Sequence, residues 1–221
     1  MSDQTCDCCG TADNTTADDR WLTEPVMNAP LPLDMKHNTS QFFGRGIDTL
    51  DAFAESIREV TESDGGGGDG SSCGSFAIDD LCHVEAETPH RATTADQTYY
   101  FRCFYDGIIL AYLADEPVEI RTESPVGKPI EMRASPNGTI DATPSGAVMS
   151  FGIATDVEPS ADDTDPTVGE IVEMVMCPYV KAFPTRDAYA YWAEGSDGAT
   201  VGMPLAASVP FAAALTKRNT G

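Results

Sequence analysis

The hydrophobic and polar positions of this 221-residue chain predict a helical first part. Between residues 21 and 64 the pattern is helical, and the clearest helix begins near residue 50, with Asp48 as its expected cap. Its apolar residues lie three or four positions apart, as on one helix face: Leu50, Phe53, Ile57 and Val60. This part ends at residues 65–72, a glycine-rich and serine-containing run that is typical of a flexible linker.

The remaining chain mixes strand and helix patterns. Turn signals separate several of its short strand-like segments, and strands that follow one another in this way pair mainly antiparallel. An apolar helix is expected at 104–113, and a helix capped by Thr167 is expected to carry Cys177 near its end. The predicted strands are 97–102, 118–123, 130–134, 139–143, 147–153, 179–183 and 200–205, with further helices at 185–193 and 209–216. The expected fold class is α+β, a mainly antiparallel sheet with packed helices.

Three regions follow from this layout: a tail at 1–19, a helical region at 20–72 and a larger domain at 73–221. The tail is acidic and lacks an apolar period, so we expect it to be disordered. It holds three cysteines, which are either exposed by chance or capture a thiophilic metal: Cys6, Cys8 and Cys9. An odd total of seven cysteines, without an export signal, favours free thiols over a disulfide framework.

Composition narrows the range of partners and surroundings. The chain has 13 basic and 36 acidic residues, a formal net charge of −23. The acids are spread along the sequence, as expected for a halophilic protein from a salt-loaded cytoplasm, where salt screens self-repulsion. Nucleic-acid binding is not expected, because it requires a basic surface. No apolar run approaches the roughly 20 residues of a membrane helix, so we expect a cytoplasmic protein.

The most suggestive chemistry is a cysteine followed three residues later by an aspartate. Cys103 and Asp106 lie at a predicted strand-to-helix junction, where this spacing places both on one helix face. A helix N-terminus is expected to lower the pKa of the thiol, whereas apolar surroundings raise the pKa of the carboxyl. The alternative is structural, with a small buried cysteine and a capping aspartate. The spacing alone does not decide between them.

Other chemistries have weaker support. A cysteine hydrolase needs a histidine base, but two of the three histidines, His83 and His90, are expected in a loop. The third, His37, lies much earlier in the sequence. Cys82 and His83 offer a start to a zinc site, but no Cys-x-x-Cys pair completes it. The glycine run is not followed by the Lys-Ser or Lys-Thr pair of a phosphate loop.

From about residue 88 to 215 the chain resembles the alkylmercury lyases, the organomercurial lyases of mercury-resistance systems. The resemblance rests on an ordered Cys-x-x-Asp and a distant second cysteine, together with several flanking tracts. These are Thr88-Pro89-His90, 99–113 with Cys103-Phe104-Tyr105-Asp106, 118–129, Thr143-Pro144-Ser145, 177–183 with Cys177-Pro178-Tyr179, and Trp192. The N-terminal helical part resembles, more loosely, the winged helix of that family.

The resemblance implies that Cys103 and Cys177 bind mercury and that Asp106 handles the proton. The enzyme would cleave R–Hg(II) to R–H and Hg(II) without a cofactor, within apolar walls near Phe104, Tyr105 and Phe151. Small thiols or a mercuric reductase would receive the metal. The alternative is a non-catalytic protein that binds Hg(II) or Cu(I) with the same cysteines. A metal-sensing regulator is a weaker third hypothesis, since no basic recognition helix is present.

The charge of the chain leads to a first test. In dilute buffer the unscreened acidic side chains repel one another, so we expect the protein to lose compactness and helical signal. Circular dichroism in molar potassium chloride and after dialysis into dilute buffer measures this change. A spectrum that is the same in both would contradict salt adaptation.

Overall fold

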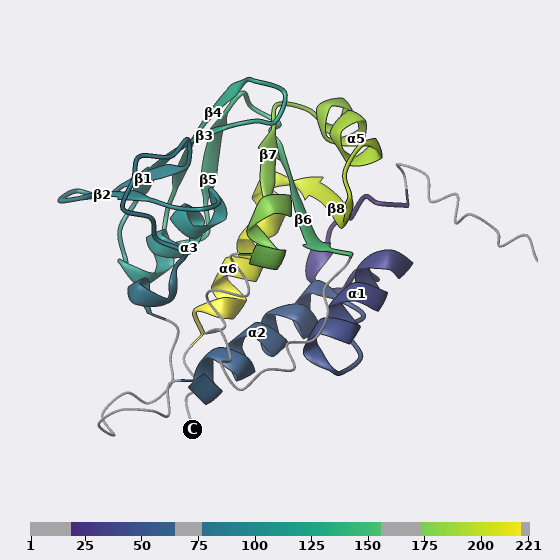
Figure 1. Cartoon of the computed structure of the whole chain (residues 1–221). Coiled ribbons are helices and arrows are strands. Elements are labelled where there is room, and N and C mark those ends of the chain that lie inside the picture. The colour runs from purple at the N-terminus through teal and green to yellow at the C-terminus, as the bar shows by residue number, and fades with distance from the viewer. Residues whose placement is uncertain (1–18, 65–76, 156–173, 218–221) are drawn as a thin grey trace, which may run out of the picture.

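The fold combines two antiparallel sheets with packed helices (Figure 1). A computed structural model describes residues 19–64, 77–155 and 174–217 of the chain. The helices are α1 (Leu33–Phe43), α2 (Leu50–Asp64), α3 (Tyr105–Leu113), α5 (Arg186–Glu194) and α6 (Val209–Leu215). The strands are β1 (Arg91–Thr93), β2 (Thr98–Tyr100), β3 (Val118–Glu123), β4 (Pro129–Ala134), β5 (Ile140–Thr143), β6 (Val148–Ala154), β7 (Lys181–Phe183) and β8 (Gly198–Pro204). The α+β class expected from the sequence is confirmed.

The larger sheet has the strand order β2-β1-β3-β4-β5 and presents one face to the core. Along β3 and β4 buried and exposed residues alternate strictly, as in a sheet with one solvated face. Helix α3 packs on the buried face at very short range. A Cβ at Gly107 of α3 would lie 2.9 Å from Ile120 Cγ1. Glycine therefore lets the first turn of α3 lie directly against the sheet.

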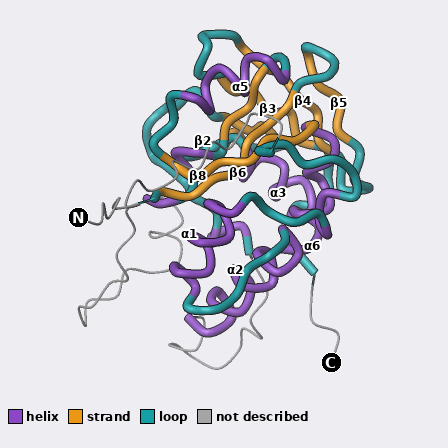
Figure 2. The backbone as a smooth tube through the Cα atoms, turned by 90° about the vertical axis from the view of Figure 1, so that its right-hand side faces the viewer, coloured by secondary structure: helices purple, strands orange, loops and turns teal. Residues whose placement is uncertain are grey.

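The smaller sheet has the order β7-β6-β8, and β6 is its central strand. The strand expected at 147–153 is therefore present, but it does not continue the sequential sheet, and this part of the prediction was wrong. The burial of β6 gives the reason: Val148 through Ile153 are all buried, so the strand needs cover on both faces. Helix α5 lies on one side of this sheet, and α1 lies on the other (Figure 2).

The N-terminal helices share the core of the rest of the chain. Helix α1 packs against β6 and β8, and α2 packs against α6. One apolar cluster extends from Leu22 to Leu215. Thr49 rather than Asp48 caps α2, because its hydroxyl accepts from the Ala52 N–H at 3.2 Å. The boundary at residues 72 and 73 and the winged-helix likeness stay predictions.

Several expected features lie outside the described residues. These are almost all of the tail with Cys6, Cys8 and Cys9, the glycine-rich segment and most of the helix expected after Thr167.

A short turn, η3 (Cys177–Tyr179), packs against β6 and contains the candidate site residue Cys177. The Ser150 hydroxyl of β6 donates to the Tyr179 carbonyl at 2.7 Å. A Cβ at Gly152 would lie 2.6 Å from Tyr179 Cβ and 2.9 Å from the Ala199 carbonyl oxygen. The absence of a side chain at Gly152 therefore sets how closely the Cys177 turn approaches the sheet.

Replacing Gly152 with alanine tests this contact. We expect Gly152→Ala to lower the free energy of unfolding by about 1–3 kcal/mol, because the added methyl group meets backbone and Cβ atoms that cannot rotate away. Thermal or denaturant unfolding in high salt measures the loss. Gly46→Ala is the matched control, because a Cβ there meets nothing within 4 Å. Equal stability of the two variants would contradict the close approach.

Candidate active site

Cys103 and Asp106 form a local pair at the start of α3. Asp106 lies in the first turn of the helix, and Cys103 lies two residues before the helix begins at Tyr105. The Cys103 thiol donates to Asp106 Oδ2 at 3.6 Å, and both side chains are buried. The close packing of α3 on the sheet holds this pair inside the protein rather than at its surface.

Cys177 reaches the pair from a distant part of the chain. It begins η3, which the Ser150 contact ties to β6. Its thiol lies near enough to the Cys103 thiol for the two groups to shift each other's pKa. The structure thus brings together the three residues that the sequence singled out.

A fourth residue, Cys82, joins them. Its carbonyl accepts from the Arg102 N–H at 3.0 Å, and the Val84 N–H donates to the Tyr100 carbonyl at 2.9 Å. This pairing places Cys82 beside the chain that leads to Cys103. The Cys177 thiol donates to Cys82 Sγ at 3.7 Å. Three ligand atoms lie within 4.8 Å of one another: the sulfurs of Cys82 and Cys177 and a carboxylate oxygen of Asp106.

Cys82 could hardly have been found from the sequence alone. It lies 21 residues before Cys103, and its neighbour His83 suggests only the start of a zinc site. The backbone separates these two neighbours, since successive side chains of an extended segment point to opposite faces. His83 Nε2 contacts the Ile78 carbonyl at 2.7 Å, and its ring packs beside Tyr99. Cys82 contributes to the site and His83 does not.

The Thr88-Pro89-His90 tract is hydrogen-bonded to the chain that leads to Cys103. The Thr88 hydroxyl donates to the Phe101 carbonyl at 2.9 Å, and the Phe101 N–H donates to the His90 carbonyl at the same distance. His90 Nδ1 lies 2.7 Å from the Thr122 hydroxyl of β3. Burial, and then the charge of Lys181, lower the pKa of His90 to about 4, so this histidine is neutral at pH 7. These contacts fix the chain just before Cys103.

Burial dominates the electrostatics of Asp106. It raises the pKa of the carboxyl to about 7, while hydrogen bonds with the Cys103 side chain and the Cys82 backbone act in the opposite direction. The expected upward shift is confirmed. Near neutral pH this carboxyl therefore exchanges readily between its protonated and ionised forms.

The expected low pKa of the Cys103 thiol was wrong. A hydrogen bond with Cys177 lowers this pKa, but burial and the charges of Asp106 and Cys82 raise it above the ordinary value. Hydrogen bonds to Cys103 and Cys82, together with burial, raise the pKa of Cys177. The helix N-terminus does not offset this low-dielectric surrounding, so both thiols are protonated at rest.

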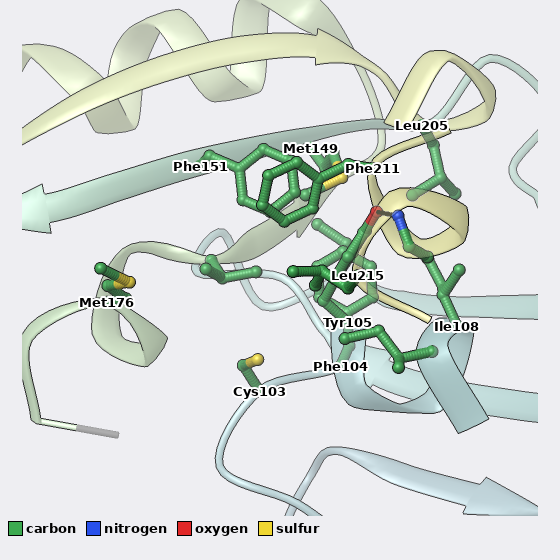
Figure 3. Packing of buried hydrophobic residues seen from close by; sticks show 14 of the residues in the cluster. Cys103, Phe104, Tyr105, Ile108, Met149, Phe151, Met176, Leu205, Phe211 and Leu215 are labelled. Atoms are coloured by element: carbon green, nitrogen blue, oxygen red, sulfur yellow. Dashed lines mark hydrogen bonds between the residues drawn. The ribbon is translucent and has the colours of Figure 1, made fainter. Parts of the chain in front are cut away.

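Aromatic and aliphatic side chains line the core beside Cys103 (Figure 3). The ring of Tyr105 meets Phe151 edge to face, with centroids 5.0 Å apart. The Tyr105 hydroxyl donates to the Ser208 carbonyl at 2.6 Å and accepts from the Ala212 N–H at 3.1 Å. Phe211 of α6 packs on Phe151, with ring centroids 4.7 Å apart. The sequence alone did not suggest Phe211 as part of this wall. The ring of Tyr105 is therefore fixed in place.

The sequence profile of the alkylmercury lyases (MerB) matches residues 84–217, more than half of the chain. The chain belongs to the alkylmercury lyase family. The family match includes Cys103, Asp106 and Cys177, and it begins two residues after Cys82.

Solved structures add a more distant likeness. The mercury-bound form of MerB2 is similar at 18% sequence identity with a TM-score of 0.45, and the likeness covers 59% of this chain and 59% of that one. The chain thus spans less than two thirds of that lyase-family structure. A comparison with curated proteins finds no match. None of the helices in the three described ranges has the length and hydropathy that crossing a bilayer requires.

The raised pKa of Asp106 affects stability. Unfolding returns the carboxyl to its usual pKa of 3.8, so the folded state binds the proton more tightly. Its contribution to stability is complete below about pH 4 and is lost as pH rises through 7. At about 1.4 kcal/mol per pH unit, the loss between pH 5 and pH 8 is about 3 kcal/mol.

Asp106→Asn removes this titration. We expect the stability of the variant relative to the parent to rise by about 3 kcal/mol from pH 5 to pH 8. Denaturant unfolding in high salt at the two pH values measures the difference. Asp141→Asn, at an exposed carboxyl on β5, should follow the parent. A pH-independent difference between the parent and Asp106→Asn would show that the carboxyl is ionised when buried.

Proposed function

We propose that this protein is an organomercurial lyase that cleaves R–Hg(II) by protonolysis to R–H and Hg(II). The observation that carries the proposal is the buried contact of Asp106 with Cys103, beside the free thiol of Cys177, which alters the pKa of Cys103. The proposed catalytic residues are Cys103, Asp106 and Cys177. Membership of the alkylmercury lyase family supports the same reaction.

The thiols bind the metal. Mercury(II) is a soft cation and prefers sulfur ligands. Cys103 displaces the exchangeable ligand X of R–Hg–X, forming an S–Hg bond and releasing HX. Cys177 then adds to the metal, and its proton passes to Asp106 in the ionised form, which a pKa of about 7 leaves populated near neutral pH. Metal binding lowers the pKa of a coordinating thiol, so thiols that are protonated at rest still become ligands.

Asp106 completes the reaction. Electron donation from two thiolates weakens the carbon–mercury bond, and the Asp106 carboxylic acid delivers its proton to the carbon. The carbon–mercury bond breaks as the carbon–hydrogen bond forms. The products are R–H, Hg(II) held by two thiolates, and the Asp106 carboxylate. A pKa of about 7 suits a group that first accepts a proton and then donates it.

The apolar wall protects this chemistry. Phe104, Tyr105 and Phe151 are buried, and they offer the organic group an apolar surface that excludes water. Water exclusion reserves the carbon for protonation by Asp106. Because Tyr105 is anchored through its hydroxyl, its role is to shape this surface rather than to exchange protons.

The partners follow from the products. No cofactor is needed, because mercury is both part of the substrate and the product. Small thiols remove Hg(II) and restore the free cysteines for another turnover, and a mercuric reductase is the further acceptor. The reaction belongs in the cytoplasm, where thiols stay reduced. The tail with Cys6, Cys8 and Cys9 has no assigned step in this scheme.

The alternative is a non-catalytic protein that binds Hg(II) or Cu(I). The cluster of Cys82, Asp106 and Cys177 favours metal binding as such. Asp106 favours the enzyme, because sequestration requires thiols but not a group that exchanges protons near neutral pH.

Benzene release separates the two functions. The protein in high salt with excess small thiol should convert phenylmercury to benzene, measured by gas chromatography. Cys103→Ser should remove turnover, and Asp106→Asn should lower it by about 100-fold or more, because the general acid is lost. Asp141→Asn is the matched control and should keep full turnover.

Two outcomes contradict the proposal in different ways. Benzene release no faster than in Cys103→Ser would leave metal binding as the function. Full turnover by Asp106→Asn would assign the proton to another donor.

A further inference from the structure

Three thiols, rather than two, meet at this site. The Cys177 thiol donates to Cys82 Sγ at 3.7 Å, and it lies near enough to the Cys103 thiol for the two to shift each other's pKa. All three residues are more than nine-tenths buried, with exposed fractions of 8% for Cys82 and 4% for the others. The lyase chemistry described above uses Cys103 and Cys177 and leaves Cys82 without a role.

The position of Cys82 is built into the fold. Its backbone carbonyl accepts from the N–H of Arg102, the residue before Cys103, and its backbone also interacts with the carboxyl of Asp106. Its sulfur lies 3.7 Å from Cys177 Sγ. A metal bound to Cys177 therefore meets the Cys82 sulfur after a small adjustment of side chains.

We propose that Cys82 is the third sulfur ligand of the Hg(II) product, so that Cys82, Cys103 and Cys177 together hold it as a tris-thiolate. The inference rests on the proposed function for the origin of the metal, but binding of added Hg(II) tests it independently. The ligand class is a soft cation that accepts three thiolates.

Formation of the third S–Hg bond conserves protons and charge. While R is bound, carbon occupies one position on mercury. Departure of R–H opens that position and leaves the Asp106 carboxylate within 4.8 Å of the Cys82 thiol. Cys82 then forms an S–Hg bond, and its proton passes to this carboxylate. The neutral bis-thiolate becomes an anionic tris-thiolate beside a neutral acid, and no oxidant or reductant takes part.

This third bond distinguishes product from substrate. R–Hg(II) engages the two lyase thiols, whereas bare Hg(II) gains one more sulfur ligand. The product is therefore retained until small thiols replace the protein sulfurs one by one. The third ligand thus slows the loss of Hg(II) from the site until such an exchange takes place.

X-ray absorption at the mercury edge counts the sulfur neighbours directly. The full chain should carry Cys6→Ser, Cys8→Ser, Cys9→Ser and Cys73→Ser, so that added Hg(II) meets only the three thiols of the site. One equivalent of Hg(II) is added to the reduced protein without small thiols. We expect three sulfur neighbours in this parent and two after Cys82→Ser, with at least a ~10-fold loss of Hg(II) affinity in competition with a dithiol.

His83→Ala is the matched control. It alters the same backbone segment, but the His83 side chain contacts Ile78 and Tyr99 instead of the thiols. We expect it to keep three sulfur neighbours. Two sulfur neighbours in the parent would overturn the proposal without relying on any Cys82 variant, and so would three in a folded Cys82→Ser protein.

The two proposals fail separately. Benzene release from phenylmercury with only two sulfurs on the product would reject the role of Cys82 and leave the lyase intact. Three sulfurs on added Hg(II) without benzene release would reject the lyase and leave a tris-thiolate metal trap.

Discussion

Burial of the Asp106 carboxyl among thiols is the constraint on which this site depends. A charge costs free energy in so apolar a place, so the carboxyl holds its proton up to about pH 7 and the Cys103 and Cys177 thiols remain protonated. The resting site is thus close to neutral. Arrival of a cation reverses this balance, because positive charge at the sulfurs favours thiolates. The same burial that suppresses charge at rest makes the site responsive to a soft metal.

The fold meets this constraint by bringing three segments together in its core. Helix α3 packs on the larger sheet through Gly107 and carries Asp106, while η3 packs on the smaller sheet over Gly152 and carries Cys177. The segment with Cys82 pairs with the chain that leads into α3. The site therefore lies between helix α3 on the larger sheet and the turn η3 on the smaller one, and in each of these two contacts a glycine permits the close approach.

Local pattern predicted much of this arrangement, because alternation and helical spacing record burial. The boundaries of β3, β4 and α3 lie within a residue or two of those expected, and the Cys103–Asp106 contact follows from their spacing. Three features were not accessible in this way. They are the position of β6 in a second sheet, the closeness of Cys82 to Cys177, and the raised pKa of Cys103. All three arise from tertiary packing. Each depends on residues far apart in sequence, for which a single sequence holds no spacing signal.

The separation of 3.7 Å between the sulfurs of Cys82 and Cys177 also makes these two cysteines sensitive to oxidation. A disulfide needs an S–S distance of about 2.05 Å, so the two atoms are near bonding range without being bonded. A two-electron oxidant that joined them would remove two sulfurs from metal binding at once. Reducing equivalents are therefore as much a requirement of this site as the metal itself. In the proposed reaction the small thiols that accept Hg(II) would also keep these cysteines reduced, which would link turnover to the redox state of the surroundings.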